Sequence, residues 1–163
     1  MDKRTSKVNY YLDIADAVLA RSTCLRRKYG AIIVRNDEIL ATGYNGAPRG
    51  RRNCSDLGFC SREHLHIPSG ERYELCRSVH AEANAIISAA RRDMIGSTLY
   101  LVGRDAKTNE LLEGTTSCSM CRRQIINAGI TQVICRVAGG KPVITNVQDW
   151  IDNDDSLPEP PEA

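Results

Sequence analysis

Helical and strand-like segments alternate along this chain, and the alternation limits the folds that it can adopt. Residues 8–22 carry apolar side chains at helical spacing. Two short apolar runs follow, at 31–35 and 38–44, and only the turn-forming pair Asn36-Asp37 separates them. Alternating apolar runs joined by two such residues predict an antiparallel hairpin.

The rest of the chain continues this alternation. We expect a second helix at about 79–92, capped by Ser78, and a third from about Cys118 to just before Gly129. The order predicts a three-layer α/β/α domain, with a five-stranded mixed sheet between helices. The buried face expected for the second helix is Ala83, Ile86, Ile87 and Ala90, and the further strands are expected at 97–103, 132–137 and 141–145.

The length of 163 residues suits one domain with its own core, which we place at 1–151. Residues 152–163 contain five acids, three prolines and no base, so we expect a flexible tail there. Without the tail the chain has 22 basic and 15 acidic residues, which favours an anionic partner, although a solvated basic surface is an alternative. No apolar run approaches the roughly 20 residues of a membrane span, and no secretory signal is evident. We expect a soluble, cytoplasmic protein.

Seven cysteines are present, and the uneven spacing of most of them indicates metal binding or catalysis, because cytosolic thiols stay reduced. The segment 45–77 has no clear periodicity, and a connection of that length in a compact domain needs a function or a local cross-link. Cys135 lies in an apolar strand and is expected to be an ordinary core thiol. Trp150, just before the acidic tail, is expected to anchor the C-terminus.

Two groups of candidate ligands fall where predicted helices begin. Cys118 and Cys121 have a C-x-x-C spacing that places both thiols on one helix face, where the positive end of the helix favours thiolates. His80 would complete three zinc ligands and leave a fourth position open for water, as in catalytic sites. Glu82 could then reach that water without binding the metal. A redox C-x-x-C pair is the alternative, but it would leave His80 and Glu82 unexplained.

Four motifs occur in order between Arg21 and Arg136: STCLRRKYGAIIV, ILATGYNGAPRG, VHAEANAI and SCSMCRRQIINAGI. With H-x-E followed by C-x-x-C, the sequence resembles the zinc-dependent cytidine and deoxycytidylate deaminase superfamily, and within it the dCMP deaminase branch. The resemblance implies hydrolytic deamination of dCMP to dUMP. Deamination of a base in nucleic acid, or of another free nucleobase or nucleoside, is an alternative, although few aromatic residues are available for stacking bases. A non-catalytic zinc module is a third alternative, and Glu82 argues against it.

The resemblance also implies roles for individual residues. His80, Cys118 and Cys121 would bind zinc, while Glu82 would carry a proton from the attacking water to N3 of the pyrimidine. The backbone at Ala81 would contact the base, and Asn45 the sugar. For the phosphate we favour Arg26, with the neighbouring basic residues as alternatives. Those alternatives are Arg27, Arg49 and Arg51.

A second, structural zinc is implied as well, bound by cysteines around the irregular segment. Its ligands would be Cys24, Cys54, Cys60 and Cys76, with His64 or His66 as alternatives to Cys60. Ordinary buried or surface thiols are the competing interpretation. The family further suggests a homo-oligomer and regulation by deoxynucleoside triphosphates.

The sequence departs from the family pattern at Ser117, where proline normally precedes the first cysteine. Proline fixes its own φ and restricts the residue before it, so serine removes a restraint on the ligand loop. We expect the geometry of this loop to differ.

Overall fold

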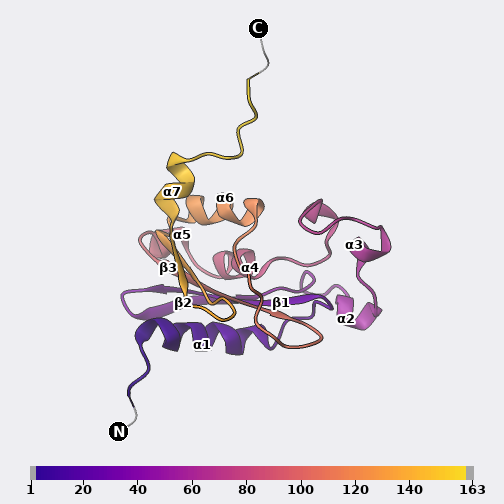
Figure 1. Cartoon of the computed structure of the whole chain (residues 1–163), viewed down its shortest axis with the longest axis horizontal. Helices are drawn as coiled ribbons and strands as arrows, with labels where there is room; N and C mark the ends of the chain where they lie inside the picture. Colours follow the sequence, from indigo (N-terminus) through magenta and orange to yellow (C-terminus); the bar gives the residue numbers. More distant parts are fainter. Residues whose placement is uncertain (1–2, 161–163) are drawn as a thin grey trace.

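Five strands form one mixed sheet in the order β2-β1-β3-β4-β5 in the computed structural model, which describes residues 3–160. The β3 and β4 strands are parallel, and the other neighbouring pairs are antiparallel. Helices cover both faces of the sheet (Figure 1), so the predicted three-layer α/β fold is confirmed. The strands are β1 (Arg27–Arg35), β2 (Glu38–Tyr44), β3 (Thr98–Asp105), β4 (Gln132–Cys135) and β5 (Val143–Asn146).

The hairpin of β1 and β2 turns at the predicted pair. Asn36 and Asp37 have φ values of 51° and 62°, the left-handed conformation that a two-residue turn of this kind requires. The Asp37 carboxylate accepts hydrogen bonds from Lys7 and Tyr11 of the first helix. These contacts fix the hairpin turn against that helix.

Helix α1 (Lys7–Leu19) covers one face of the sheet. The Oγ of Ser6 accepts a hydrogen bond from the amide of Asn9 and caps the helix. The predicted apolar stripe packs on the sheet, with Leu12 and Ala15 fully buried. The helix is shorter than the predicted 8–22, because Ser22 turns away to hydrogen-bond Asn45.

The opposite face is covered by α4 (Ala81–Ile87), α5 (Arg91–Met94), α6 (Ser119–Ala128) and α7 (Val147–Asp152). Helix α6 lies on the crossover between the parallel strands β3 and β4. It ends at Gly129, whose φ of 82° is the left-handed C-cap expected from the sequence. Its Ile125 is fully buried in the core on this side of the sheet.

The single helix predicted at 79–92 is wrong in its bounds. Its predicted buried face is correct at Ala83, which is buried, and at Ile86, which packs against the core, but wrong at Ile87 and Ala90. His80, not Ser78, is the N-cap, and the helix stops near Ser88, whose Oγ donates to the carbonyl of Asn84 and competes with the backbone ladder. Ile87 is 74% exposed, and Ala90 is exposed too. Ala81 and Ala85 face the sheet in their place.

The irregular segment 45–77 contains only short helical turns, at one end of the sheet (Figure 1). They are α2 (Cys54–Leu57), α3 (Ser61–His64) and a 3-10 turn, Tyr73–Leu75. The buried Arg62 organises this segment, donating to the carbonyls of Pro68 and Glu71 at 2.9 and 2.7 Å.

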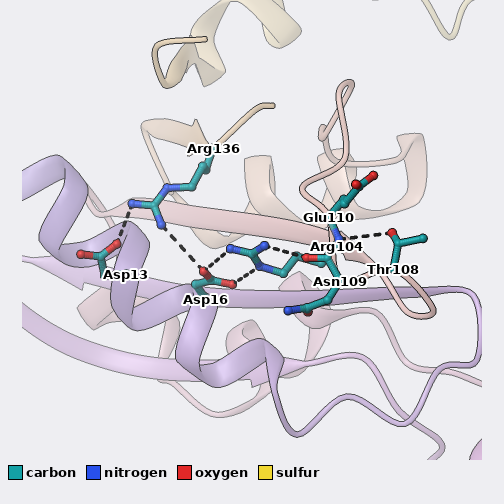
Figure 2. Close-up of polar contacts among 7 residues, drawn as sticks. All are labelled: Asp13, Asp16, Arg104, Thr108, Asn109, Glu110 and Arg136. Carbon is teal, nitrogen blue, oxygen red and sulfur yellow. Dashed lines mark hydrogen bonds and ion pairs between the residues drawn. The ribbon is translucent and has the colours of Figure 1, made fainter. Parts of the chain in front are cut away.

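Ion pairs tie α1 to the sheet on the side away from α4 and α6. Arg104 of β3 donates to both carboxylate oxygens of Asp16 at 2.7 Å, and to the carbonyl of Asn109 (Figure 2). Arg136, just after β4, pairs with Asp13 at 2.8 Å. The two arginines and the two aspartates therefore neutralise one another's charge.

Helix α7 was not foreseen from the sequence, although Trp150 lies in it and packs against the core. Beyond Asp152, residues 153–160 are exposed and form neither helix nor strand. Positions 161–163 of the expected flexible tail lie outside the described residues, and the division into a domain and a tail stays a prediction. None of the helices in the described part of the chain is both long and apolar enough to cross a membrane.

Candidate metal centre

Three candidate metal ligands lie at the starts of two helices on the same face of the sheet. His80 is the N-cap residue of α4, and Cys118 is the N-cap residue of α6. Neither makes a side-chain capping hydrogen bond, so both side chains are free to turn toward each other. Cys121 follows three residues after Cys118, on the same face of the first turn of α6.

The geometry of these side chains fits zinc. The Nδ1 of His80 lies 3.4 Å from the Sγ of Cys118 and 3.4 Å from the Sγ of Cys121. Tetrahedral zinc with its usual bond lengths to nitrogen and sulfur would separate such atoms by about 3.6 Å. Within residues 3–160, this trio is the one group of histidine, cysteine or acidic residues whose ligand atoms all lie within 4.8 Å of one another. Because three ligands leave one tetrahedral position open, the site is of the catalytic type.

The contact between the two thiols shifts their pKa values in opposite directions. Hydrogen bonding from Cys121, helped by His80, lowers the pKa of Cys118 to about 4. The same hydrogen bond and burial raise the pKa of Cys121. The contact with Cys118 also raises the pKa of His80 above its ordinary value. Metal binding must therefore displace a proton from this cluster, as a thiolate site requires.

Glu82 is buried beside this trio, with 5% of its surface exposed. Burial raises the pKa of its carboxyl group, and the neighbouring Cys118 adds to this effect. A backbone hydrogen bond to the carboxyl group and the nearby His80 act against this rise. A carboxyl group with a raised pKa holds a proton more readily than an ordinary glutamate and can therefore serve in proton transfer.

A cavity opens next to the metal ligands, and most of the predicted substrate residues line it. Asn45, Ala81 and Arg26 are among its walls, together with Glu82 and Arg27. Of the four arginines proposed for phosphate, Arg26 and Arg27 therefore reach the cavity. Arg49 and Arg51 are exposed and do not line it.

The buried side chain of Asn45 holds the cavity wall together. Its Oδ1 accepts hydrogen bonds from Ser22 at 2.5 Å and from the amide of Tyr29 at 2.8 Å. Its Nδ2 donates to the carbonyl of Arg27 at 2.9 Å. An amide carries two N–H donors, so one remains for a ligand in the cavity.

Several residues of this cavity were not predicted from the sequence, among them Tyr29, Arg62 and Tyr73. The Arg62 guanidinium lies over the Tyr73 ring, 4.6 Å from the ring centre. The Tyr73 and His80 rings are nearly perpendicular, with 5.1 Å between their centres. The second half of the irregular segment therefore forms a wall of the cavity. Its lack of periodicity hid these contacts, and only the aromatic and basic side chains within it pointed to them.

The four cysteines of the predicted second site gather around the same segment. Cys24, Cys60 and Cys76 line the cavity, while Cys54 is buried at the start of α2. Burial, followed by the other three thiols, raises the pKa of Cys54. No three of their sulfur atoms all lie within 4.8 Å of one another, unlike the ligand atoms of the His80 trio. His64 lies in α3 and His66 follows it, and both are exposed.

An open nitrogen and sulfur site beside a buried glutamate, on a three-layer α/β fold, defines a zinc centre of the hydrolytic class. The family model of the cytidine and deoxycytidylate deaminase zinc-binding region matches residues 5–137. The chain belongs to this family, and zinc is its metal.

Several deoxycytidylate deaminases are similar to the chain. The deoxycytidylate deaminase of Mycobacterium phage D29 is 38% identical over 130 residues, which cover 77% of this chain and 90% of the phage protein. The deoxycytidylate deaminase of Schizosaccharomyces pombe is 33% identical over 131 residues. The aligned region covers 80% of this chain but 37% of the yeast protein, so the chain spans less than half of that relative. The solved structure of dCMP deaminase from the cyanophage S-TIM5, in complex with dCMP and dUMP, is 26% identical with a TM-score of 0.56, covering 83% and 85% of the two chains.

Proposed function

We propose that this protein catalyses the hydrolytic deamination of dCMP to dUMP. The observation that carries the proposal is the buried Glu82 beside His80, Cys118 and Cys121, in a cavity lined by Asn45 and basic residues. The similarity to deoxycytidylate deaminases, one of them solved with dCMP and dUMP, supports this choice of substrate.

Zinc would supply one element of the chemistry: in the open position it lowers the pKa of a water molecule, so that the water attacks near neutral pH. His80, Cys118 and Cys121 would hold the metal, and the cavity wall would exclude bulk water from it.

Glu82 would be the proton carrier of the reaction. Its carboxylate accepts a proton from the attacking water and delivers it to N3 of the pyrimidine as the new oxygen bond forms at C4. The proton of the new C4 hydroxyl then passes through Glu82 to the amino group, the C4–N bond breaks, and ammonia leaves as the C4 carbonyl forms. The raised pKa of Glu82 suits both directions of transfer.

The cavity walls would orient the nucleotide. The backbone of Ala81 borders the cavity next to Glu82 and would contact the base, while the free N–H of Asn45 would contact the sugar. Arg26 and Arg27 would bind the phosphate. Arg26 is held in place by an ion pair with Glu63 at 2.9 Å.

Ammonia release by the zinc-loaded protein would test the proposal directly. The substrates to compare are dCMP, CMP, deoxycytidine, cytosine, guanine and a short single-stranded oligonucleotide. We expect dCMP to react fastest, and Glu82→Gln to keep its zinc while losing about 10²- to 10⁴-fold in kcat. Turnover of the oligonucleotide without turnover of dCMP would instead favour a nucleic-acid deaminase.

The phosphate assignment has its own test. Arg26→Ala should raise KM for dCMP while leaving kcat/KM for deoxycytidine unchanged, because only the nucleotide carries a phosphate. Arg49→Ala is the matched control, since this exposed arginine lies outside the cavity. Equal effects of Arg26→Ala on both substrates would exclude a phosphate contact.

A second, structural zinc bound by Cys24, Cys54 and Cys76 remains part of the proposal, with Cys60, His64 or His66 as its fourth ligand. The proximity of the other three thiols supports it, since after burial they raise the pKa of Cys54. Elemental analysis should give two zinc ions per chain, and one in Cys54→Ser. A single zinc in the unmodified protein would exclude the second site.

The predicted homo-oligomer and the deoxynucleoside triphosphate effectors also remain proposals. Light scattering of the purified protein measures the first, and dCMP titrations with and without deoxycytidine or thymidine triphosphate measure the second.

A further inference from the structure

The two residues before the ligand Cys118 are held from one side by Arg122. The Nε of Arg122 donates to the carbonyl of Ser117 at 3.0 Å, and its Nη2 donates to the Oγ1 of Thr116 at 3.4 Å. Ser117 itself is buried, and its Oγ has no hydrogen-bond partner within the described residues. The segment is therefore fixed through its backbone and through Thr116.

Arg122 is in turn held by the C-terminal helix. Its guanidinium lies over the ring of Trp150 in α7, 5.0 Å from the ring centre. A guanidinium over an indole face is attracted by the ring quadrupole and keeps its plane. Asp155, 86% exposed, lies 3.8 Å from Nη1 and contributes little, because water screens exposed pairs. Trp150 is thus the main support of this guanidinium.

We propose that Arg122, stacked on Trp150, is a positioning residue that fixes the Thr116–Ser117 backbone and thereby aims Cys118 at the zinc. The guanidinium binds no metal itself. It acts through the Ser117 carbonyl, one peptide unit before the ligand.

The residue at position 117 explains why such a support is needed. Serine leaves φ free where proline would fix it near −65° and would also restrict Thr116. A hydrogen bond from a stacked, planar guanidinium supplies the missing restraint from outside the loop. The backbone N–H of Ser117 makes no hydrogen bond to another backbone group within residues 3–160, so proline at this position would remove none.

Zinc release from the folded protein is the direct test. The loaded protein is mixed with a chromogenic chelator, and the release rate is followed, with circular dichroism confirming the fold of each variant. We expect Arg122→Ala to release zinc about tenfold faster, the order found when residues that orient a metal ligand are lost. Arg123→Ala is the matched control, because Arg123 is the exposed neighbour on the same helix. Equal rates for Arg122→Ala and Arg123→Ala would overturn the proposal.

Arg122→Lys separates positioning from charge and serves if the alanine variant fails to fold. Lysine keeps the positive charge but loses the flat fork that reaches two acceptors and stacks on the indole. We expect it to release zinc faster too. A rate equal to that of the unmodified protein would mean that charge alone matters, which contradicts positioning.

Rescue completes the test. Ser117→Pro in the Arg122→Ala background should bring the release rate back toward that of the unmodified protein, because proline restrains the same peptide units. Failure of the rescue would show that Arg122 acts elsewhere. The inference rests on the zinc site within the proposed function, but the release rate needs no substrate. The role of Arg122 can therefore be decided even in a protein that proves inactive on dCMP.

Discussion

Gly43 of β2 lies directly against the carbonyl of Ala81, the residue between His80 and Glu82. A Cβ on Gly43 would be 2.3 Å from that oxygen and 2.4 Å from the amide nitrogen of Ala85. Both distances are far below van der Waals contact, and both neighbours are backbone atoms that cannot rotate away. The absence of a side chain at Gly43 therefore sets the distance between the sheet and the helix that carries a metal ligand and the proposed proton carrier.

Gly43→Ala should push α4 away from β2. We expect a loss of about 1–3 kcal/mol in the free energy of unfolding, together with a fall in zinc content, because His80 moves with the helix. Urea unfolding and elemental analysis measure the two effects. Gly140→Ala is the control, since a Cβ there meets only ordinary contacts at 3.6 Å or more. Normal zinc content in the Gly43 variant would show that α4 adjusts without moving its ligand.

Glu82→Gln should stabilise the zinc-free protein at neutral pH. Burial raises the pKa of Glu82, so the folded state disfavours the charged form, and ionisation costs stability. The cost is absent below the ordinary glutamate pKa of 4.5, grows as pH rises through it, and becomes constant above the raised value. Denaturant unfolding in the presence of a chelator, from pH 4 to 8, measures this cost. The free energy of unfolding of the variant should exceed that of the parent by an amount that grows with pH and then becomes constant. A gain that is the same at all pH values would contradict ionisation as its cause.

Cys118 should be the first thiol alkylated in the metal-free protein at pH 6. The hydrogen bond from Cys121 lowers the pKa of Cys118 and favours its thiolate, whereas burial raises the pKa of Cys135 to about 12 and keeps that thiol protonated. Peptide mapping after brief iodoacetamide treatment identifies the modified residues, and zinc should protect Cys118. Earlier modification of Cys24 or Cys60 would argue against this charge distribution.

Asp16→Ala should destabilise the fold without affecting zinc binding. It removes the two carboxylate oxygens that accept from Arg104, whose side chain is 22% exposed, so we expect a loss of about 1–3 kcal/mol. Asp13→Ala is the milder comparison, since Asp13 is 62% exposed and should cost about 0.5 kcal/mol or less. Thermal unfolding and zinc content measure the two effects, and altered zinc content in Asp16→Ala would reveal coupling across the sheet.

Features set by neighbouring residues in the chain were predictable from the sequence. The Asn36-Asp37 turn, the buried stripe of α1, the Gly129 C-cap and the start of α6 at Cys118 all depend on local preferences. The proximity of His80, Cys118 and Cys121 was also predictable from local signals, because ligands at the starts of helices lie close together when the helices pack on one face of a sheet.

Features set by tertiary contacts could not be predicted in this way. Ile87 fits the apolar spacing of a helix, yet it is exposed. The missing side chain at Gly43 lets the face of α4 that carries Ala81 and Ala85 pack closely on the sheet, which leaves Ile87 on the outer side. The short helices of 45–77 follow no periodic pattern in the sequence. The same holds for two side-chain contacts, the stacking of Arg62 on Tyr73 and that of Arg122 on Trp150.

The uncapped starts of α4 and α6 have a consequence for the dynamics of the empty site. The first amides of a helix have no partner within it, and at both helices the residue that would normally cap them faces the metal. Deuterium should therefore enter residues 81–83 and 119–121 faster after chelation, in two segments that lie far apart in the chain. Parallel changes in their exchange rates would show that one ion secures two helix ends at once.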